Sequence, residues 1–94
     1  MRSKKLYRAR HILVEYKEDA LYVLRQLKDG VDFAKLAKDY SECSSSEDGG
    51  NLGKFSSGMM VAEFERGLYQ LKIGEISEPI RTKFGYHIIE RQEV

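Results

Sequence analysis

The sequence contains almost no cysteine and no tryptophan, and its apolar residues are dispersed. Its single thiol, Cys43, cannot form an internal disulfide, so the composition gives no sign of an oxidising compartment. The longest apolar runs are a few residues, far short of the ~20 that a membrane-spanning helix needs. No charged start followed by an apolar stretch is present, so we predict no signal peptide. We expect a cytoplasmic protein, unless the chain is a domain excised from a larger secreted or periplasmic protein.

Positive and negative charges are nearly equal in number, with 16 lysines and arginines against 15 aspartates and glutamates and a net charge of +1. This balance provides no general attraction to nucleic acid or to anionic membranes, and we expect neither as a partner. The first ten residues are locally basic and contain no acid. Because Tyr7 is the only aromatic among them, no stacking surface for nucleic acid is indicated. We therefore predict a frayed N-terminus over residues 1–5.

The length of 94 residues favours a single domain spanning residues 1–94, and we expect a monomer. A domain of this size buries only about 60–65 % of the surface that its unfolded chain exposes. The core is therefore thin, and any binding site should be a surface groove rather than an enclosed chamber.

Four segments have the spacing of β-strands. Residues 6–14 alternate, with Tyr7, Ala9, His11 and Leu13 on one face. Residues 51–55, 76–80 and 86–91 are the other three predicted strands, and the last two are joined as a hairpin through residues 81–85.

Three segments have helical spacing. The first covers residues 19–29, and Gly30 stands where a left-handed cap would end it. Asp32 predicts the N-cap of a second helix. The apolar faces of the second and third helices are Phe33, Leu36, Ala37 and Tyr40, and Val61, Phe64, Leu68 and Leu71. With residues 41–50 as a loop, the order predicts an α+β fold in which helices pack on a mainly antiparallel sheet.

Both histidines of the chain lie in predicted strands. His11 is followed by Ile12 and Leu13, and His87 by Ile88 and Ile89. A lone histidine in an apolar strand is usually a hydrogen-bonded core residue. If the two strands are neighbours, however, the imidazoles could touch, and each would fix the tautomer of the other.

Cys43 lies in a polar stretch of the predicted loop, so it is not expected to be a core thiol. A thiol near a histidine could be a nucleophile, or it could be a bystander, and the sequence favours neither. Two histidines and a cysteine are also a valid zinc ligand set. Zinc sites usually contain at least one close ligand pair, which these widely separated residues lack, so we expect no metal and no cofactor.

Several segments, in order along the chain, resemble parvulin-type peptidyl-prolyl cis/trans isomerases. The resemblance extends from about Arg8 to Arg91. The segments that carry it are Arg10–Val14, Asp32–Ala37, Ser44–Ser45, Gly50–Phe55, Gly58–Val61, Phe64, Gly74–Ser77 and Phe84–Ile89.

This resemblance implies a four-stranded antiparallel sheet surrounded by helices, and an enzyme that turns X-Pro bonds in client segments. His11 and His87 match the paired histidines of the family, and Thr82 matches a hydroxyl bonded to that pair. Cys43 matches a thiol position that other members fill with aspartate. The proline ring would enter an apolar pocket with Phe84 at its rim, and the pocket residues would be Leu52, Met60 and Phe64.

The chain departs from the phosphorylation-directed members of the family. Those carry a long basic loop after the first strand, whereas residues 15–19 contain three acids and one lysine. A dianionic phosphate would be repelled there, so we predict no preference for phosphorylated Ser/Thr-Pro. The absence of tryptophan also excludes a second, tryptophan-rich proline-binding module.

Two other functions compete with catalysis of isomerisation. The main alternative is a weakly active or inactive domain that binds client peptides like a chaperone. The presence of His11, Cys43, Thr82 and His87 together favours catalysis, because a pure binding module has less need of all four. A cysteine hydrolase is less favoured, since no oxyanion hole and no group orienting a histidine can be identified.

Overall fold

The computed structural model describes residues 5–94, so of the predicted frayed segment it describes only Lys5. No helix among these residues is both long and apolar enough to span a membrane. The elements in chain order are β1 (Leu6–Val14), α1 (Lys17–Lys28), α2 (Phe33–Tyr40), the 3₁₀ helix η1 (Ser44–Asp48), β2 (Asn51–Ser56), α3 (Ala62–Tyr69), β3 (Ile80–Thr82) and β4 (Gly85–Gln92).

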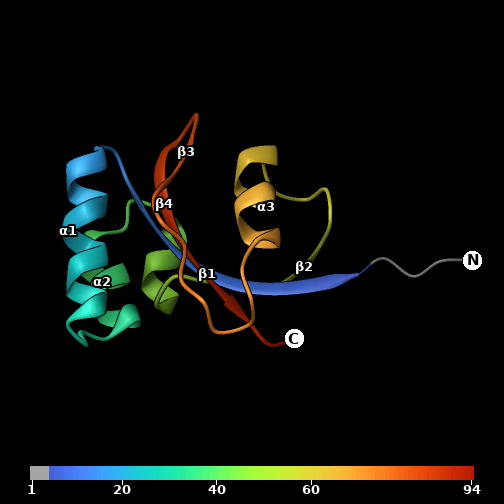
Figure 1. Ribbon diagram of the computed structural model, residues 1–94, viewed down its shortest axis with the longest axis horizontal. Helices are drawn as coiled ribbons and strands as arrows, with labels where there is room; N and C mark the ends of the chain where they lie inside the picture. Colours follow the sequence, from blue (N-terminus) through green and yellow to red (C-terminus); the bar gives the residue numbers. More distant parts are fainter. Residues whose placement is uncertain (1–4) are drawn as a thin grey trace, which may run out of the picture.

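The four strands form one antiparallel sheet in the order β2-β1-β4-β3, which confirms the predicted α+β architecture (Figure 1). β1 is a central strand because it pairs with β2 on one side and with β4 on the other. In the β1–β4 register, His11 is opposite Ile89 and Leu13 is opposite His87. The first and last strands of the chain are therefore neighbours, and they bring the two histidines into one region of the sheet.

Each face of the sheet is covered by its own helices and has its own core (Figure 1). α1 and α2 pack against Ile12, Val14 and Ile88 on one face. α3 packs on the other face, which carries Ala9 and Ile89. The alternation predicted for residues 6–14 is confirmed, because even and odd positions of β1 enter different cores.

The starts of α1 and α2 follow different rules. Asp32 is the N-cap of α2 as predicted, and its Oδ2 accepts a hydrogen bond of 3.1 Å from Lys35 N. α1 begins at Lys17, two residues before the predicted start, although Tyr16 provides no side-chain cap. Glu18 and Asp19 in its first turn favour this start because they complement the positive end of the helix dipole. The link from β1 to α1 therefore consists only of Glu15 and Tyr16.

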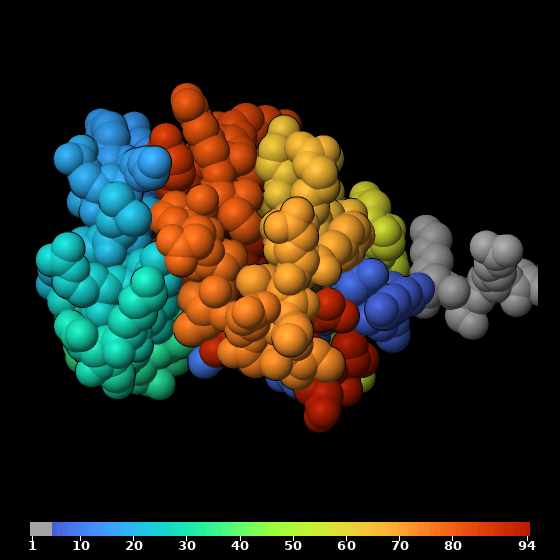
Figure 2. Space-filling model, in the orientation of Figure 1, coloured from blue at the N-terminus to red at the C-terminus, as the bar shows by residue number. Residues whose placement is uncertain are grey.

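Two local predictions were wrong. The predicted strand at residues 76–80 is a single bridge from Ile76 to Glu90, and the paired segment of β3 begins only at Ile80. Pro79 has no N–H to donate in a ladder, and Ile89 N donates to the side-chain Oγ of Ser77 rather than to a backbone carbonyl. Residues 70–79 instead run as an irregular segment over the front of the molecule (Figure 2).

The second wrong prediction concerns Tyr40, which was placed on the buried face of α2. It is 43 % exposed, and its ring packs edge-on against Tyr22 at 5.8 Å. The apolar pattern of α2 therefore continues past its buried residues, which are Phe33, Leu36 and Ala37. The predicted loop at residues 41–50 also contains a short regular element, η1.

Candidate functional site

The two histidines lie on the same face of adjacent strands and share a hydrogen bond. Because Leu13 is opposite His87, His11 lies diagonally across from it on the α3 side of the sheet. The two Nδ1 atoms are 3.0 Å apart, and the rings stack at 5.1 Å between centroids. His11 is 4 % exposed and His87 3 %, so the pair is shielded from water.

A hydroxyl extends this hydrogen bond into a chain. Thr82 Oγ1 lies 2.7 Å from His87 Nε2 and also accepts a hydrogen bond of 3.1 Å from Phe84 N. One proton occupies the Nδ1–Nδ1 contact of a neutral pair, and either histidine can supply it. The threonine satisfies both arrangements, since it can donate to His87 Nε2 or accept from it. Thr82 therefore keeps the pair bonded in either tautomer.

Burial sets the charge of the pair. Burial, with a smaller contribution from the charge of His87, lowers the pKa of His11 from 6.5 to about 4. Burial also lowers the pKa of His87 to about 4. Both imidazoles are therefore neutral at pH 7. His11 Nε2 is buried and has no hydrogen-bond partner among residues 5–94.

A surface pocket of about 390 Å³ opens beside this pair, and we call it the central pocket. Its volume is within the range of small-ligand sites. Phe64 forms part of its wall and contacts both imidazoles edge-on, at 5.6 Å from His11 and 5.5 Å from His87. The lining residues are His11, Leu13, Cys43, Leu52, Met59, Met60, Val61, Phe64, Phe84 and His87. Most of these side chains are apolar, so the pocket suits an apolar group.

Hydrogen bonds to β1 bring Cys43 to the central pocket. Ser41 Oγ accepts from Leu13 N at 3.0 Å and from Cys43 N at 3.4 Å, and Glu42 N donates to Leu13 O at 2.7 Å. The chain after α2 is therefore fixed along the end of β1. The half-buried thiol shares the pocket with His11, whose Nε2 has no partner among the described residues, so the two are not hydrogen-bonded. A nucleophilic Cys–His pair is not formed here.

The structure brings together all eight residues that the sequence singled out. Seven of them line the central pocket, and Thr82 lies behind His87. Sequence reasoning missed Leu13, Met59 and Val61 as lining residues. Leu13 shares the strand face of His11, and the other two flank Met60, so position alone could have indicated them. Within residues 5–94, no three His, Cys, Asp or Glu side chains are grouped so that they could hold a metal ion.

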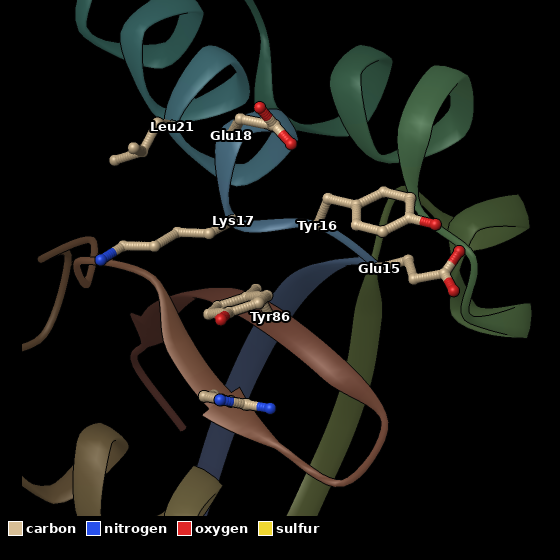
Figure 3. A pocket seen from close by; sticks show the side chains of 7 residues that line it. Glu15, Tyr16, Lys17, Glu18, Leu21 and Tyr86 are labelled. Carbon is tan, nitrogen blue, oxygen red and sulfur yellow. The ribbon is translucent and has the colours of Figure 1, made fainter.

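A second pocket, of about 520 Å³, lies by the β1–α1 link (Figure 3). We call it the link pocket, and its lining residues are Glu15, Tyr16, Lys17, Glu18, Leu21, Arg81 and Tyr86. Tyr86 is on the opposite face of β4 from His87, so the link pocket and the central pocket belong to different faces of the sheet. Acidic and basic side chains are mixed around it, and it contains none of the predicted site residues.

Comparison with known proteins gives concordant matches. Residues 8–93 match the family described as the PPIC-type PPIase domain, or rotamase. The foldase protein PrsA of Caldanaerobacter subterraneus is 46 % identical over 93 residues, which are 98 % of this chain but 30 % of that protein. The chain thus spans less than a third of the length of this curated relative.

Solved structures agree with these matches. The crystal structure of the peptidylprolyl isomerase PrsA from Bacillus anthracis superposes with a TM-score of 0.93 at 44 % identity, and the match covers 95 % of this chain and 42 % of that chain. The solution structure of NmPin, the parvulin of Nitrosopumilus maritimus, has a TM-score of 0.85 at 46 % identity, and the match covers 99 % of this chain and 100 % of that chain.

Proposed function

This chain belongs to the PPIC-type peptidyl-prolyl cis/trans isomerases, the parvulins, and we propose that it turns X-Pro bonds of flexible client segments in the central pocket without requiring phosphorylation. The observation that supports this most is the position of an apolar pocket directly against a neutral, buried histidine pair. Such a site can hold a proline ring while the preceding amide rotates.

The reaction demands little chemistry from the protein. No covalent bond breaks, but the partial double bond of the amide opposes rotation with a barrier of ~18–20 kcal/mol. An acceleration of ~10⁴-fold needs about 5–6 kcal/mol of extra transition-state binding. The task is therefore to bind the twisted amide more tightly than either planar form.

The apolar wall binds the proline ring and surrounds the rotating amide with a less polar environment than water. Leu52, Met60 and Phe64 hold the proline ring in place, so the rotating part is the carbonyl side of the bond. A twisted amide has lost resonance, and its carbonyl is less polar than that of the planar amide. A drier groove therefore favours the twisted form over the planar ones.

The polar wall supplies fixed dipoles. Cys43, His11 and His87 line the pocket directly, and Thr82 lies behind His87 and holds the histidine pair through a hydrogen bond. Such groups need no reorientation when the amide twists, which is the condition for electrostatic preorganisation. We assign Cys43 a hydrogen-bonding role rather than a nucleophilic one, because no bonded histidine activates its thiol.

The short β1–α1 link supports independence from phosphate. It offers Glu15, and the first turn of α1 adds Glu18 and Asp19, against Lys17 in the same stretch of chain. Figure 3 shows Glu15, Lys17 and Glu18 around the link pocket. Around the link pocket, Glu15 and Glu18 balance Lys17 and Arg81, so a phosphoserine before the proline would find no cluster of positive charge there. We expect neutral and basic residues to be tolerated before proline.

The test is cis/trans exchange of short Ala-X-Pro-Phe peptides measured by NMR, with X varied and a phosphoserine peptide included. Fast exchange on unphosphorylated peptides, and equal or slower exchange on the phosphopeptide, supports the proposal. Acceleration only on the phosphopeptide would refute independence from phosphate. Cleavage of the peptide, detected by mass spectrometry, would indicate a hydrolase, since isomerisation leaves the mass of the peptide unchanged.

A peptide-binding module remains the second candidate, because relatives such as PrsA carry the name foldase and are much longer than this domain. Peptide binding without acceleration would favour it. For a free-standing form of the domain we propose a monomer in the cytoplasm. Where the domain is part of a longer foldase, the compartment follows from that whole protein.

A further inference from the structure

The wall of the central pocket that contains the two adjacent methionines belongs to a segment without regular structure. Residues 57–61 connect β2 to α3, and three of them, Met59, Met60 and Val61, line the pocket. Met59 is 67 % exposed, so packing alone holds this part of the wall weakly. The position of Met60 against the pocket therefore depends on how the backbone of this segment is held.

One buried carboxylate holds it. Glu65 lies on α3 and is 8 % exposed, which is unusual for a glutamate. Its Oε2 accepts hydrogen bonds from Gly58 N at 2.9 Å and from Met60 N at 3.0 Å. Its Oε1 lies 3.0 Å from Gly58 N and accepts from Tyr69 Oη at 2.8 Å. Two backbone donors of the segment thus end on one side chain.

The tyrosine ties a third residue of the segment to the same carboxylate. A carboxylate only accepts, so Tyr69 donates its single hydroxyl proton to Glu65. Ser57 Oγ, which lies 2.8 Å from Tyr69 Oη, must therefore donate to that oxygen. Burial by itself raises the pKa of Glu65, but the hydrogen bonds from Met60, Tyr69 and Gly58 together bring it below the ordinary value. The carboxylate is ionised at neutral pH, and its hydrogen bonds are charge-assisted.

We propose that Glu65 is a positioning residue for catalysis: it fixes residues 57–61 so that Met60 presents the wall against which the proline ring binds. This inference rests on the proposed function of the central pocket. Glu65 is not among the residues that line the pocket, so it acts through Met60.

The expected effect is on substrate affinity rather than on turnover. A segment that is competent only a tenth of the time raises the apparent dissociation constant about tenfold, because binding must first select the competent form. The histidine chain and Cys43 are held by β1, β4 and Ser41, none of which depends on Glu65. Glu65→Ala should therefore raise KM by about tenfold and change kcat by less than about twofold.

Two further variants sharpen the test. In Glu65→Gln, the amide oxygen can still accept from Gly58 and Met60 while its NH₂ donates to Tyr69, so KM should lie between those of wild type and Glu65→Ala. Glu63→Ala removes the same charge from the same helix at an exposed position, and its KM should equal that of wild type.

The experiment measures KM and kcat by peptide exchange, together with the amide NMR signals of residues 57–61 and the thermal midpoint. We expect KM to rise from wild type through Glu65→Gln to Glu65→Ala. We also expect the largest changes in amide chemical shift at residues 57–61. A wild-type KM for Glu65→Ala, or an equal rise for Glu63→Ala, would overturn the proposal. If Glu65→Ala fails to fold, Glu65→Gln and Tyr69→Phe decide by the same KM comparison.

The two proposals can fail separately. If the wild-type domain does not accelerate exchange, the proposed function fails. The role of Glu65 is then tested by peptide binding. The dissociation constant of the same peptide is measured for wild type and for each variant, by titration monitored on the amide NMR signals. A dissociation constant that is the same in wild type, Glu65→Gln and Glu65→Ala would refute it.

Discussion

Mild acid should weaken the fold well before its carboxylates are protonated. Each histidine has a folded-state pKa near 4 and an unfolded value of 6.5. Below pH 6.5 the histidines of the unfolded chain bind protons, whereas those of the folded chain stay neutral. The free energy of unfolding therefore falls as the pH is lowered from 6.5 to about 4. Above pH 7 neither state protonates, and the histidines make no contribution to the pH dependence.

The magnitude follows from these values. At pH 5, protonation stabilises the unfolded state by about 2 kcal/mol for each histidine, while the folded pair is still mostly neutral. Together, His11 and His87 therefore lower the free energy of unfolding by about 4 kcal/mol relative to pH 7. With a urea m-value of about 1.5 kcal/mol/M, the unfolding midpoint should fall by about 2–3 M. Total stabilities of about 5–15 kcal/mol make this a large fraction.

The assay is urea unfolding at pH 7, 6 and 5, followed by circular dichroism. The double substitution His11→Gln and His87→Gln removes the titrating groups and should flatten the dependence. NMR titration of the imidazole signals in the wild-type domain reads the two pKa values directly, which keeps the test valid if the double variant does not fold. A midpoint unchanged between pH 7 and 5, or imidazoles that titrate near 6.5, would refute the reasoning.

Substitutions at three positions test other parts of the account. Cys43→Asp should keep measurable isomerase activity while Cys43→Ala loses part of it; a folded but inactive Cys43→Asp enzyme, assayed by peptide exchange, contradicts the hydrogen-bonding role. Thr82→Val leaves His87 Nε2 and Phe84 N without their partner and should cost about 1–3 kcal/mol in urea unfolding; an unchanged midpoint would show that the hydroxyl is dispensable. Gly50→Ala should destabilise by at least about 1–2 kcal/mol, because Gly50 has φ +88° and an added Cβ would lie 2.5 Å from His11 O; wild-type thermal stability would show that the backbone there can relax.

The two faces of β1 were predictable because strand periodicity is a local property. Alternation over residues 6–14 assigned Ala9 and Ile12 to opposite faces of the strand, and the structure buries them in different cores. The cap at Asp32 was predictable for the same reason, since its hydrogen-bond partner is three residues away.

The histidine pair illustrates what local patterns leave out. His11 and His87 are 76 residues apart, and their contact depends on β1 and β4 pairing in a register that places Leu13 opposite His87. A shift of one residue would turn one imidazole to the other face. Spacing alone could therefore suggest the pair only conditionally, and the family resemblance carried that inference.

Glu65 illustrates a second limit. Beside Phe64 on a short helix it has the sequence position of a solvent-exposed glutamate, and nothing in its periodicity indicates burial. It is buried because residues 57–61 fold back over α3 and offer it backbone donors. The geometry of an irregular segment is set by such tertiary contacts, which a hydrophobic pattern does not encode.

The most direct test of the central claim is to follow cis/trans exchange of an unphosphorylated Ala-Lys-Pro-Phe peptide by NMR with catalytic amounts of the domain, while recording which protein amides shift at saturation. The account predicts accelerated exchange, with the largest shifts at residues that line the central pocket, such as Leu52, Met60 and Phe64. Absence of acceleration by the folded domain, or shifts confined to the link pocket around Tyr16 and Tyr86, would contradict it.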